Sequence, residues 1–292
     1  MAPLTTARTT LAGLLAQWRL LAWRHLLPLR NHPGQLAGYL AQPAVMLGLF
    51  VYLPGGPAVG GDHRAALAFA LPGVLVQSAL TATVVTGTRL HADLRNGYHD
   101  RLRALPTHRG APLVGLLVAD LATTLLSTAV CLGLGFVLGF RFGTSRPEVL
   151  AGLALVVLFS AAVTWGSILV GLLARSATTA QLVGLAVLLP LTIASTACLN
   201  GRDLPPWVRG WLYANPVSHV AQAVRGLLVG HPYDERLRAD TSWALLWSLT
   251  LVVVLAPPAL GAYRQACRTG LRAEPTPGPH AADAATRVGG LA

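Results

Sequence analysis

The chain of 292 residues contains no lysine, and only 11 acidic residues accompany its 22 arginines. Charged residues make up 11% of the sequence, well below the roughly 25% that is usual in soluble domains. Hydrophobic residues make up 53%, and the mean hydropathy is +0.56. These values exclude an ordinary soluble protein and indicate an integral membrane protein.

The absence of lysine also excludes a P-loop from this sequence, because the lysine of that motif reaches the β- and γ-phosphates of a nucleotide. If the protein takes part in ATP-driven work, another chain must therefore bind ATP and Mg²⁺. A set of cations made only of arginine is typical of a GC-rich genome, so we expect a bacterial protein.

Cysteines are few and lack metal-binding spacing. Cys131, Cys198 and Cys267 form no C-x-x-C motif, and two of them lie in apolar stretches, so we interpret them as small hydrophobic residues. The nine histidines are scattered, and no H-E-x-x-H motif or pair of acids lies in an apolar stretch. A membrane enzyme would need such a constellation. We expect a non-catalytic chain that itself binds no metal or cofactor.

Six uncharged stretches are long enough to cross a bilayer, since a helix needs about 20 apolar residues for roughly 30 Å of hydrocarbon. The predicted fold class is an all-α membrane protein with six transmembrane helices in a domain covering 31–265. We expect Pro257 and Pro258 to interrupt the sixth span. The predicted spans are about 35–53, 65–88, 112–140, 149–173, 177–199 and 242–263.

The distribution of arginine predicts the orientation. With both termini in the cytoplasm, the cytoplasmic segments hold 14 Arg and four acids, and the external segments hold eight Arg and six acids. Because cytoplasmic segments retain positive charge, we expect a multi-pass protein of the bacterial plasma membrane with both termini inside. The net charge of +11 then reflects topology, and we predict no nucleic-acid partner.

The two ends of the sequence lie outside the predicted spans. Arg19 and Arg24 interrupt the apolar part of residues 1–30, so we expect that this segment is not a cleaved signal peptide. Apolar residues recur there at helical spacing, so we predict an amphipathic helix at the membrane interface, with a disordered leader as the alternative. Residues 266–292 are rich in Pro, Ala and Gly and predict a disordered cytoplasmic tail.

A few polar residues interrupt the apolar spans. We interpret Gln77 and Thr81 in the second span, and Gln181, Thr192 and Ser195 in the fifth, as candidates for a substrate path. The alternative is that their side chains bond to the backbone or to neighbouring helices. Asp120 is the only acid within an apolar segment, and it fits an ion pathway or a structural anchor equally well.

The segment 89–109 concentrates charge between apolar stretches, with five Arg, two Asp and three His in 21 residues. Apolar residues at steps of three or four form one stripe along it. We expect Gly97 to divide the segment into two short helices and Pro106 to end the second. A solvated loop is the alternative, but such a loop does not need an apolar stripe. The stripe consists of Leu90, Leu94, Tyr98, Leu102 and Leu105.

Residues 200–242 are too long for a turn and too apolar for a solvated loop. Trp207 and Trp211 stand where interfacial anchors are expected. Asn215 and Pro216 begin a second short helix whose apolar residues share one face, so we predict a pair of short interfacial or re-entrant helices before the last span. The apolar face comprises Val217, Val220, Ala221, Val224 and Leu228.

Two motifs resemble a known family. The sequence Asp93-Leu94-Arg95-Asn96-Gly97, followed by Asp100-Arg101-Leu102-Arg103-Ala104-Leu105-Pro106 and Arg109, is similar to the first cytoplasmic loop of ABC-2 type permeases. The daunorubicin/doxorubicin-resistance permeases are the most similar group. Pro216-Val217-Ser218-His219, with Arg225 six residues later, resembles the short external helices of the same family.

The resemblance implies a coupling helix between spans two and three that docks on a separate ATP-binding cassette subunit. It also implies an external re-entrant motif made of Asn215, Pro216, His219 and Arg225. The coupling residues would be Asp93, Leu94, Arg95, Gly97, Tyr98, Asp100, Arg101, Leu102, Arg103, Leu105 and Pro106.

The implied protein is the permease half of an exporter, a homodimer in the lipid bilayer that moves a hydrophobic or amphipathic small molecule such as an antibiotic. Two alternatives stay open. One is an ABC-2 type exporter of lipid or polysaccharide. The other is an ion-coupled secondary transporter that uses Asp120, because such transporters need titratable groups within the membrane.

Overall fold

The structure is a computed structural model of the chain, and it describes residues 33–52, 63–95, 111–197 and 205–269. Within these ranges all regular structure is helical and no strand is present. The helices are α2 (Pro33–Tyr52), α3 (His63–Arg95), α5 (Ala111–Val137), α6 (Arg146–Leu173), α7 (Ala177–Ile193), α8 (Pro206–Ala214), α9 (Pro216–Val229) and α10 (Leu237–Thr269).

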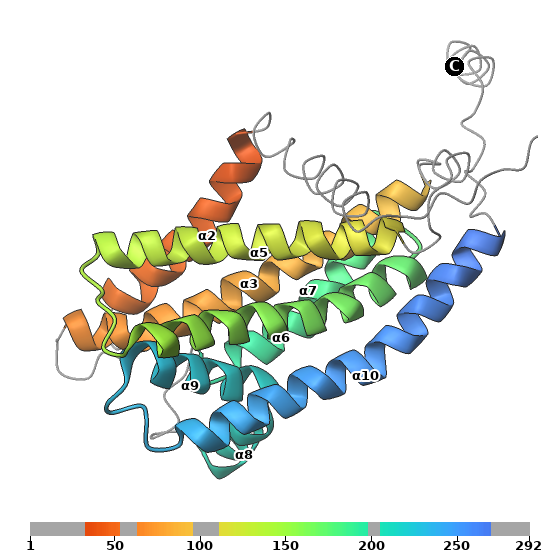
Figure 1. The fold of residues 1–292 in the computed structure, drawn as a ribbon. Helices are drawn as coiled ribbons and strands as arrows, with labels where there is room; N and C mark the ends of the chain where they lie inside the picture. Colours follow the sequence, from red (N-terminus) through yellow and green to blue (C-terminus); the bar gives the residue numbers. More distant parts are fainter. Residues whose placement is uncertain (1–32, 53–62, 96–110, 198–204, 270–292) are drawn as a thin grey trace, which may run out of the picture.

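The long helices run side by side as an antiparallel bundle, with α8 and α9 at one end of it (Figure 1). We call this the Ser145 end, because α5 turns into α6 there. Its loop is tied to α9, since the Gly143 amide donates to Leu228 O at 3.1 Å and the Thr144 hydroxyl donates to Leu227 O at 2.6 Å. We call the other end, where α6 turns into α7, the Arg175 end.

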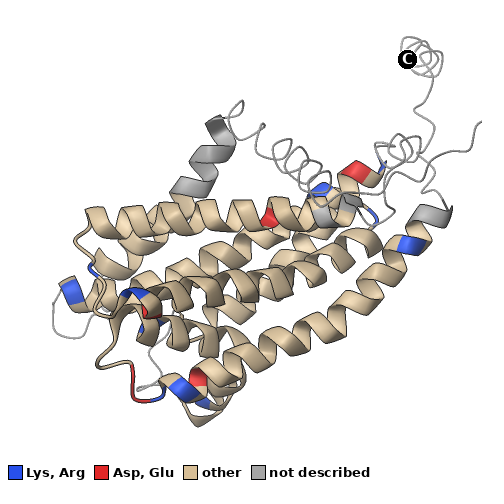
Figure 2. Cartoon of the chain, in the orientation of Figure 1, with Lys and Arg blue, Asp and Glu red and all other residues tan. Residues whose placement is uncertain are grey.

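Among the described residues, four helices are long and apolar enough to cross a membrane. They are His63–Arg95, Gly115–Val137, Arg146–Leu173 and Leu237–Ala266. Two shorter apolar helical stretches, Ala41–Tyr52 and Ala177–Ile193, fall at the predicted first and fifth spans. The charged residues of the described helices gather at the two ends of the bundle, and the stretch between them is almost uncharged (Figure 2). A multi-pass helical membrane protein is confirmed, and the full six-span topology stays a prediction.

Helix α3 is the central element of the bundle. It packs against α2, α5, α6, α7 and α9. In its most apolar stretch 83% of the residues are buried, compared with 17% in the corresponding stretch of α10. Glycines permit these close contacts: a Cβ atom on Gly73 would lie 2.1 Å from Ala197 O. The second span therefore holds the bundle together, and neighbouring helices cover most of its polar residues.

Helices α3 and α10 both differ from the prediction. Helix α3 continues to Arg95, beyond the predicted end of its span at 88. Charged residues mark the end of the apolar span, but they do not interrupt the hydrogen bonds of the helix. Helix α10 includes both Pro257 and Pro258, so the predicted interruption of the sixth span is wrong. Proline removes an amide donor, but membrane helices tolerate this loss where local adjustment satisfies the freed carbonyls. The helix instead curves along its length (Figure 1).

Candidate functional site

The predicted coupling segment begins in the last turn of α3, where Asp93, Leu94 and Arg95 lie. Leu94 is 7% exposed, whereas Arg95 is exposed and donates to Arg175 O at 3.3 Å. The structure therefore describes the base of the segment. The remaining predicted coupling residues lie outside the described residues and stay a prediction: Gly97, Tyr98, Asp100, Arg101, Leu102, Arg103, Leu105 and Pro106.

The base of this segment is embedded in an apolar cluster at the Arg175 end. Leu90 and Leu94, the first two residues of the predicted stripe, are both buried in it. The cluster joins four helices, since α5, α6 and α10 each contribute to it. Burial of these side chains fixes the direction in which α3 leaves the bundle. The other buried members are Leu113, Leu116, Ile168, Ala259 and Tyr263.

Just below this cluster, α3 and α6 meet backbone to backbone. A Cβ atom on Gly171 would lie 2.3 Å from Gly87 O, so only glycine fits there. The Ser167 hydroxyl accepts from the Gly87 amide at 3.1 Å and donates to Thr83 O at 2.6 Å. One turn on, His91 Nδ1 donates to Gly171 O at 3.1 Å. The two helices are thus joined along two turns leading to the coupling segment.

A buried polar cluster lies where α3, α5 and α6 meet. Asp120 of α5 is 2% exposed and is hydrogen-bonded to Thr86 of α3 and to Thr164 of α6, the latter at 2.5 Å. One turn further along α5, Thr124 lies 3.0 Å from the hydroxyl of Ser160. The sequence singled out Asp120 but did not indicate its pairing with these two threonines, which lie 34 and 44 residues away.

The Ser145 end is organised around Arg225 of α9, whose side chain is 0% exposed. Its Nε and Nη2 groups donate to Phe69 O at 3.1 and 3.0 Å, and Nη2 also donates to Thr196 O at 3.0 Å. Nη1 donates to Gln222 Oε1 at 2.7 Å, and the guanidinium lies 4.0 Å from the centre of the Phe69 ring. This single side chain ties α9 to α3 and to the turn after α7.

Asn215 connects three helices at the same end. Its Oδ1 caps α9 by accepting from the Val217 amide at 2.9 Å, as expected for Asn before a Pro at the first helical position. Its Nδ2 donates to Leu191 O at 2.7 Å and to Ala194 O at 3.0 Å. Carbonyls at a helix C-terminus need such partners. This explains how α7 can end at Ile193, before the predicted end of its span at 199.

His219 connects α9 to α10. Its Nδ1 lies 3.1 Å from Asp240 Oδ1, and its ring stacks on Trp243 with centroids 5.8 Å apart. All four residues of the predicted external motif, including Pro216 at the first turn of α9, therefore lie in one structural unit. The predicted apolar face of α9 is confirmed, because all five of its residues are buried. The partners Phe69, Thr196 and Asp240 had no signal in the sequence.

The predicted substrate-path residues lie on two different helices. Gln77 is buried on α3, and the Thr81 hydroxyl donates to Gln77 O at 2.9 Å. Gln181 is exposed on α7. Thr192 and Ser195 are buried at the end of α7 and bond to local backbone, at 2.8 Å to Leu188 O and 2.6 Å to Thr192 O respectively. Their role in a substrate path stays a prediction.

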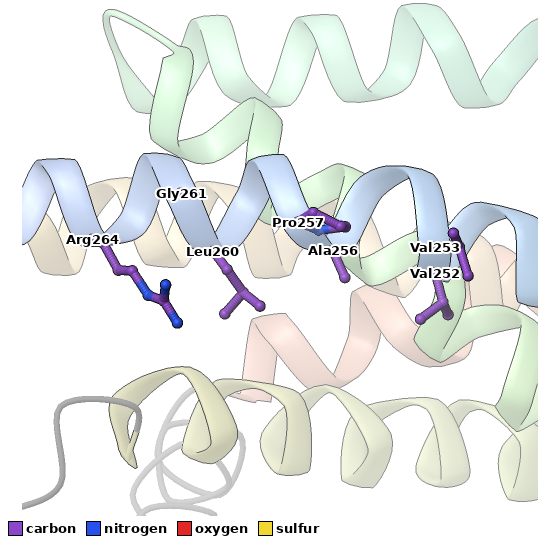
Figure 3. Close-up of a pocket in the computed structure, with 7 residues that line it drawn as sticks. All are labelled: Val252, Val253, Ala256, Pro257, Leu260, Gly261 and Arg264. Carbon is purple, nitrogen blue, oxygen red and sulfur yellow. The ribbon is translucent and has the colours of Figure 1, made fainter.

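An open hollow of about 550 Å³ lies along α10. Its lining is aliphatic except at the Arg175 end, where Arg264 stands (Figure 3). The hollow is open along the side of the helix and does not form an enclosed binding cavity. The lining residues are Val252, Val253, Ala256, Pro257, Leu260, Gly261 and Arg264.

Long apolar helices with charge restricted to their ends define a multi-pass α-helical membrane protein. A model of the ABC-2 type transporter family matches residues 16–229, and the chain belongs to this family. It is 33% identical over 242 residues to a daunorubicin resistance ABC transporter permease of Streptomyces coeruleorubidus, covering 83% of this chain and 84% of the relative. It is 27% identical over 230 residues to a probable doxorubicin resistance ABC transporter permease of Mycobacterium tuberculosis, covering 78% and 81%.

Proposed function

We propose that this chain is the membrane subunit of an exporter that is driven by a separate ATP-binding cassette subunit and moves an apolar or amphipathic small molecule out of a bacterial cell. The observation that carries this proposal is the similarity, over most of both chains, to permeases named for daunorubicin and doxorubicin resistance. The near absence of charge from the middle of the bundle (Figure 2) supports an apolar substrate.

The coupling segment is the proposed contact with the ATPase. The described base of this segment is anchored in the four-helix apolar cluster and by the backbone contact of α3 with α6. A force applied at residues 96–109 would therefore be transmitted to α3 and α6 together. If α3 and α6 then moved together as a rigid body, the bundle would alternate between inward-open and outward-open states. ATP and Mg²⁺ would be bound by the ATPase, and both termini of this chain would face it in the cytoplasm.

The proposed contact is tested by co-expressing the chain with the ATPase encoded beside it and purifying the tagged permease in mild detergent. Asp100→Ala combined with Arg101→Ala should reduce the amount of ATPase recovered or uncouple ATP hydrolysis from transport. Asp234→Ala combined with Arg236→Ala is the matched control, because both residues are exposed and lie just before α10, at the Ser145 end. If the first double variant retained wild-type coupling, Asp100 and Arg101 would lose their assigned role.

A homodimer is the proposed assembly, and α7 is a candidate for its interface. Only Ala180 and Thr192 are buried along this apolar helix, while Leu182 and Val187 are 61% and 53% exposed. In a version with its three cysteines replaced by Ser, Leu182→Cys or Val187→Cys should form a cross-linked dimer. Leu150→Cys on α6, where Leu150 is 66% exposed, should not. Equal cross-linking at all three positions would argue against this interface.

Two other functions give different results in the same reconstituted system. An exporter of lipid or polysaccharide would hydrolyse ATP faster with those molecules than with daunorubicin. A secondary transporter would move its substrate in a proton gradient without any ATPase and would require Asp120 to gain and lose a proton. Both carboxylate oxygens of Asp120 are engaged by threonines, which supports a structural role for this residue.

A further inference from the structure

The Asp120 cluster contains more acceptors than hydroxyl hydrogens if the carboxyl group is ionised. The Thr164 hydroxyl has one hydrogen, yet Thr164 Oγ1 lies 2.5 Å from Asp120 Oδ2 and 2.9 Å from Ser160 O. With an ionised Asp120, Thr164 can donate to only one of these oxygens. The short contact to the other oxygen would then place two acceptors against each other without a hydrogen between them.

A protonated carboxyl group removes this conflict. A hydrogen on Asp120 Oδ2 can be donated to Thr164 Oγ1, and Thr164 is then free to donate to Ser160 O. Thr86 Oγ1 has Asp120 Oδ1 as its acceptor, so it donates there. Every oxygen then has a compatible partner, and the chain of bonds runs from α3 through α5 into α6.

The surroundings of Asp120 are consistent with a neutral group. The facing side chains of α6 are the hydroxyls of Ser160 and Thr164, and α5 itself adds Thr123 and Thr124, both of which are buried. On α3 the charged neighbour is Arg89, which is half-buried one turn from Thr86. The positive charge of Arg89 favours an ionised Asp120, but within the described part of the chain the two side chains form no direct ion pair. Burying an ionised carboxylate without a paired charge costs far more than burying a hydrogen-bonded neutral acid.

We propose that Asp120 retains its proton in the folded bundle and acts as a neutral hydrogen-bonded clamp that holds α3, α5 and α6 together beneath the coupling segment. Asp120 is then a positioning residue for the base of that segment, and ion translocation is not its role. The protonation and packing of Asp120 concern the isolated chain and do not rest on the proposed function, whereas its relation to the coupling segment does.

Infrared spectroscopy of the purified wild-type protein tests the protonation directly. A carboxylic acid has a carbonyl stretching band that a carboxylate lacks. We expect one such band at pH 7 to 9, and Asp120→Asn should remove it. Glu148→Gln is the control, because Glu148 is exposed and should leave the band unchanged. Absence of the band from the wild type, or its persistence in Asp120→Asn, would overturn the proposal.

Stability measurements test the clamp without transport or ATPase. In Asp120→Asn the amide group can donate to Thr164 and its oxygen can accept from Thr86, so the midpoint of thermal unfolding should be no lower than that of wild type. Thr164→Val removes the central hydroxyl and should lower the midpoint by about 2–4 °C. Because the folded wild type holds a proton that Asp120 releases on unfolding, the wild type should lose stability relative to Asp120→Asn as the pH rises from 6 to 9. A large loss of stability in Asp120→Asn, or a difference that does not vary with pH, would show that the folded state does not hold this proton.

Discussion

At the Ser145 end, helix α9 packs on the bundle with a buried apolar face and is joined to it in addition by buried polar side chains. One buried guanidinium and one buried amide reach α3 and the end of α7. At the Arg175 end, α3 is held mainly by apolar side chains and by glycine-mediated backbone contact with α6. Apolar packing operates at both ends; the first adds side-chain donors that other residues cannot replace, and the second adds a close backbone contact that depends on glycine.

This difference fits the roles proposed for the two ends. An end that must receive force from another protein benefits from helices that move together, and the contact between Gly87 and Gly171 allows α3 and α6 to behave as one body. An end that must keep two short helices in place needs directional bonds, because short helices are marginally stable alone. Substitutions at the two ends should therefore have different consequences.

The largest loss of stability is expected from Arg225→Ala. The substitution removes four hydrogen bonds and leaves a cavity among buried side chains, which together should lower the free energy of unfolding by about 3 kcal/mol or more. Thermal unfolding followed by fluorescence-detected size exclusion measures this effect. Arg238→Ala, at an exposed position, is the control. Equal stability of the two variants would show that Arg225 does not organise the Ser145 end.

A smaller loss is expected from Gly171→Ala at the other end. The added Cβ would lie 2.3 Å from Gly87 O, so α3 and α6 must separate, at a cost of about 1–3 kcal/mol as in other overpacked cores. Gly133→Ala is the matched control, because a Cβ there meets nothing within 4 Å. The contact between α3 and α6 would be looser than described if both variants unfolded at the same temperature. The same pair of variants should differ in transport coupling.

Asn215→Ala should destabilise the Ser145 end by about 1–2 kcal/mol, since it removes the cap of α9 together with two bonds to the end of α7. Asn215→Asp separates these contributions. It retains the oxygen that accepts from the Val217 amide but cannot donate to Leu191 O or Ala194 O. We expect the free energy of unfolding of Asn215→Asp, measured by chemical denaturation, to lie between those of wild type and Asn215→Ala. If Asp matched wild type, the bonds to α7 would contribute little.

The smallest effect on stability is expected from Arg95→Ala. Arg95 is exposed, and its bond to Arg175 O is long at 3.3 Å, so the free energy of unfolding should change by no more than about 0.5 kcal/mol. The substitution should clearly reduce the amount of ATPase recovered in co-purification, because Arg95 belongs to the proposed coupling surface. A strongly destabilised Arg95→Ala would mean that this position serves the fold rather than the partner.

The sequence predicted the elements of this fold well, because hydrocarbon thickness and helical periodicity act locally. Uncharged length located the long helices, and Asn215 followed by Pro216 located the start of α9. Helix ends were harder to predict when distant side chains decided them. Helix α7 ends where the side chain of Asn215 satisfies its carbonyls, and Asn215 lies outside the predicted span 177–199.

The site was predictable in its residue types but not in its pairings. Asp120 stood out because polar groups in apolar surroundings need partners, Asn215 because it precedes a proline at a predicted helix start, and Arg225 because of the resemblance to ABC-2 type permeases. Their partners did not stand out, because several are backbone carbonyls, such as Phe69 O, which have no sequence signature. Gly171 also gave no signal, since its role depends on the approach of α3.

The central claim is that this chain transports only when a separate ATPase drives it. The most direct test is uptake of daunorubicin into proteoliposomes in which the cytoplasmic side of the protein faces outwards. The proteoliposomes contain the chain with or without the ATPase encoded beside it. We predict uptake only when the ATPase and hydrolysable ATP are both present, and none in response to a proton gradient alone. Proton-driven uptake by the chain without the ATPase would contradict the claim.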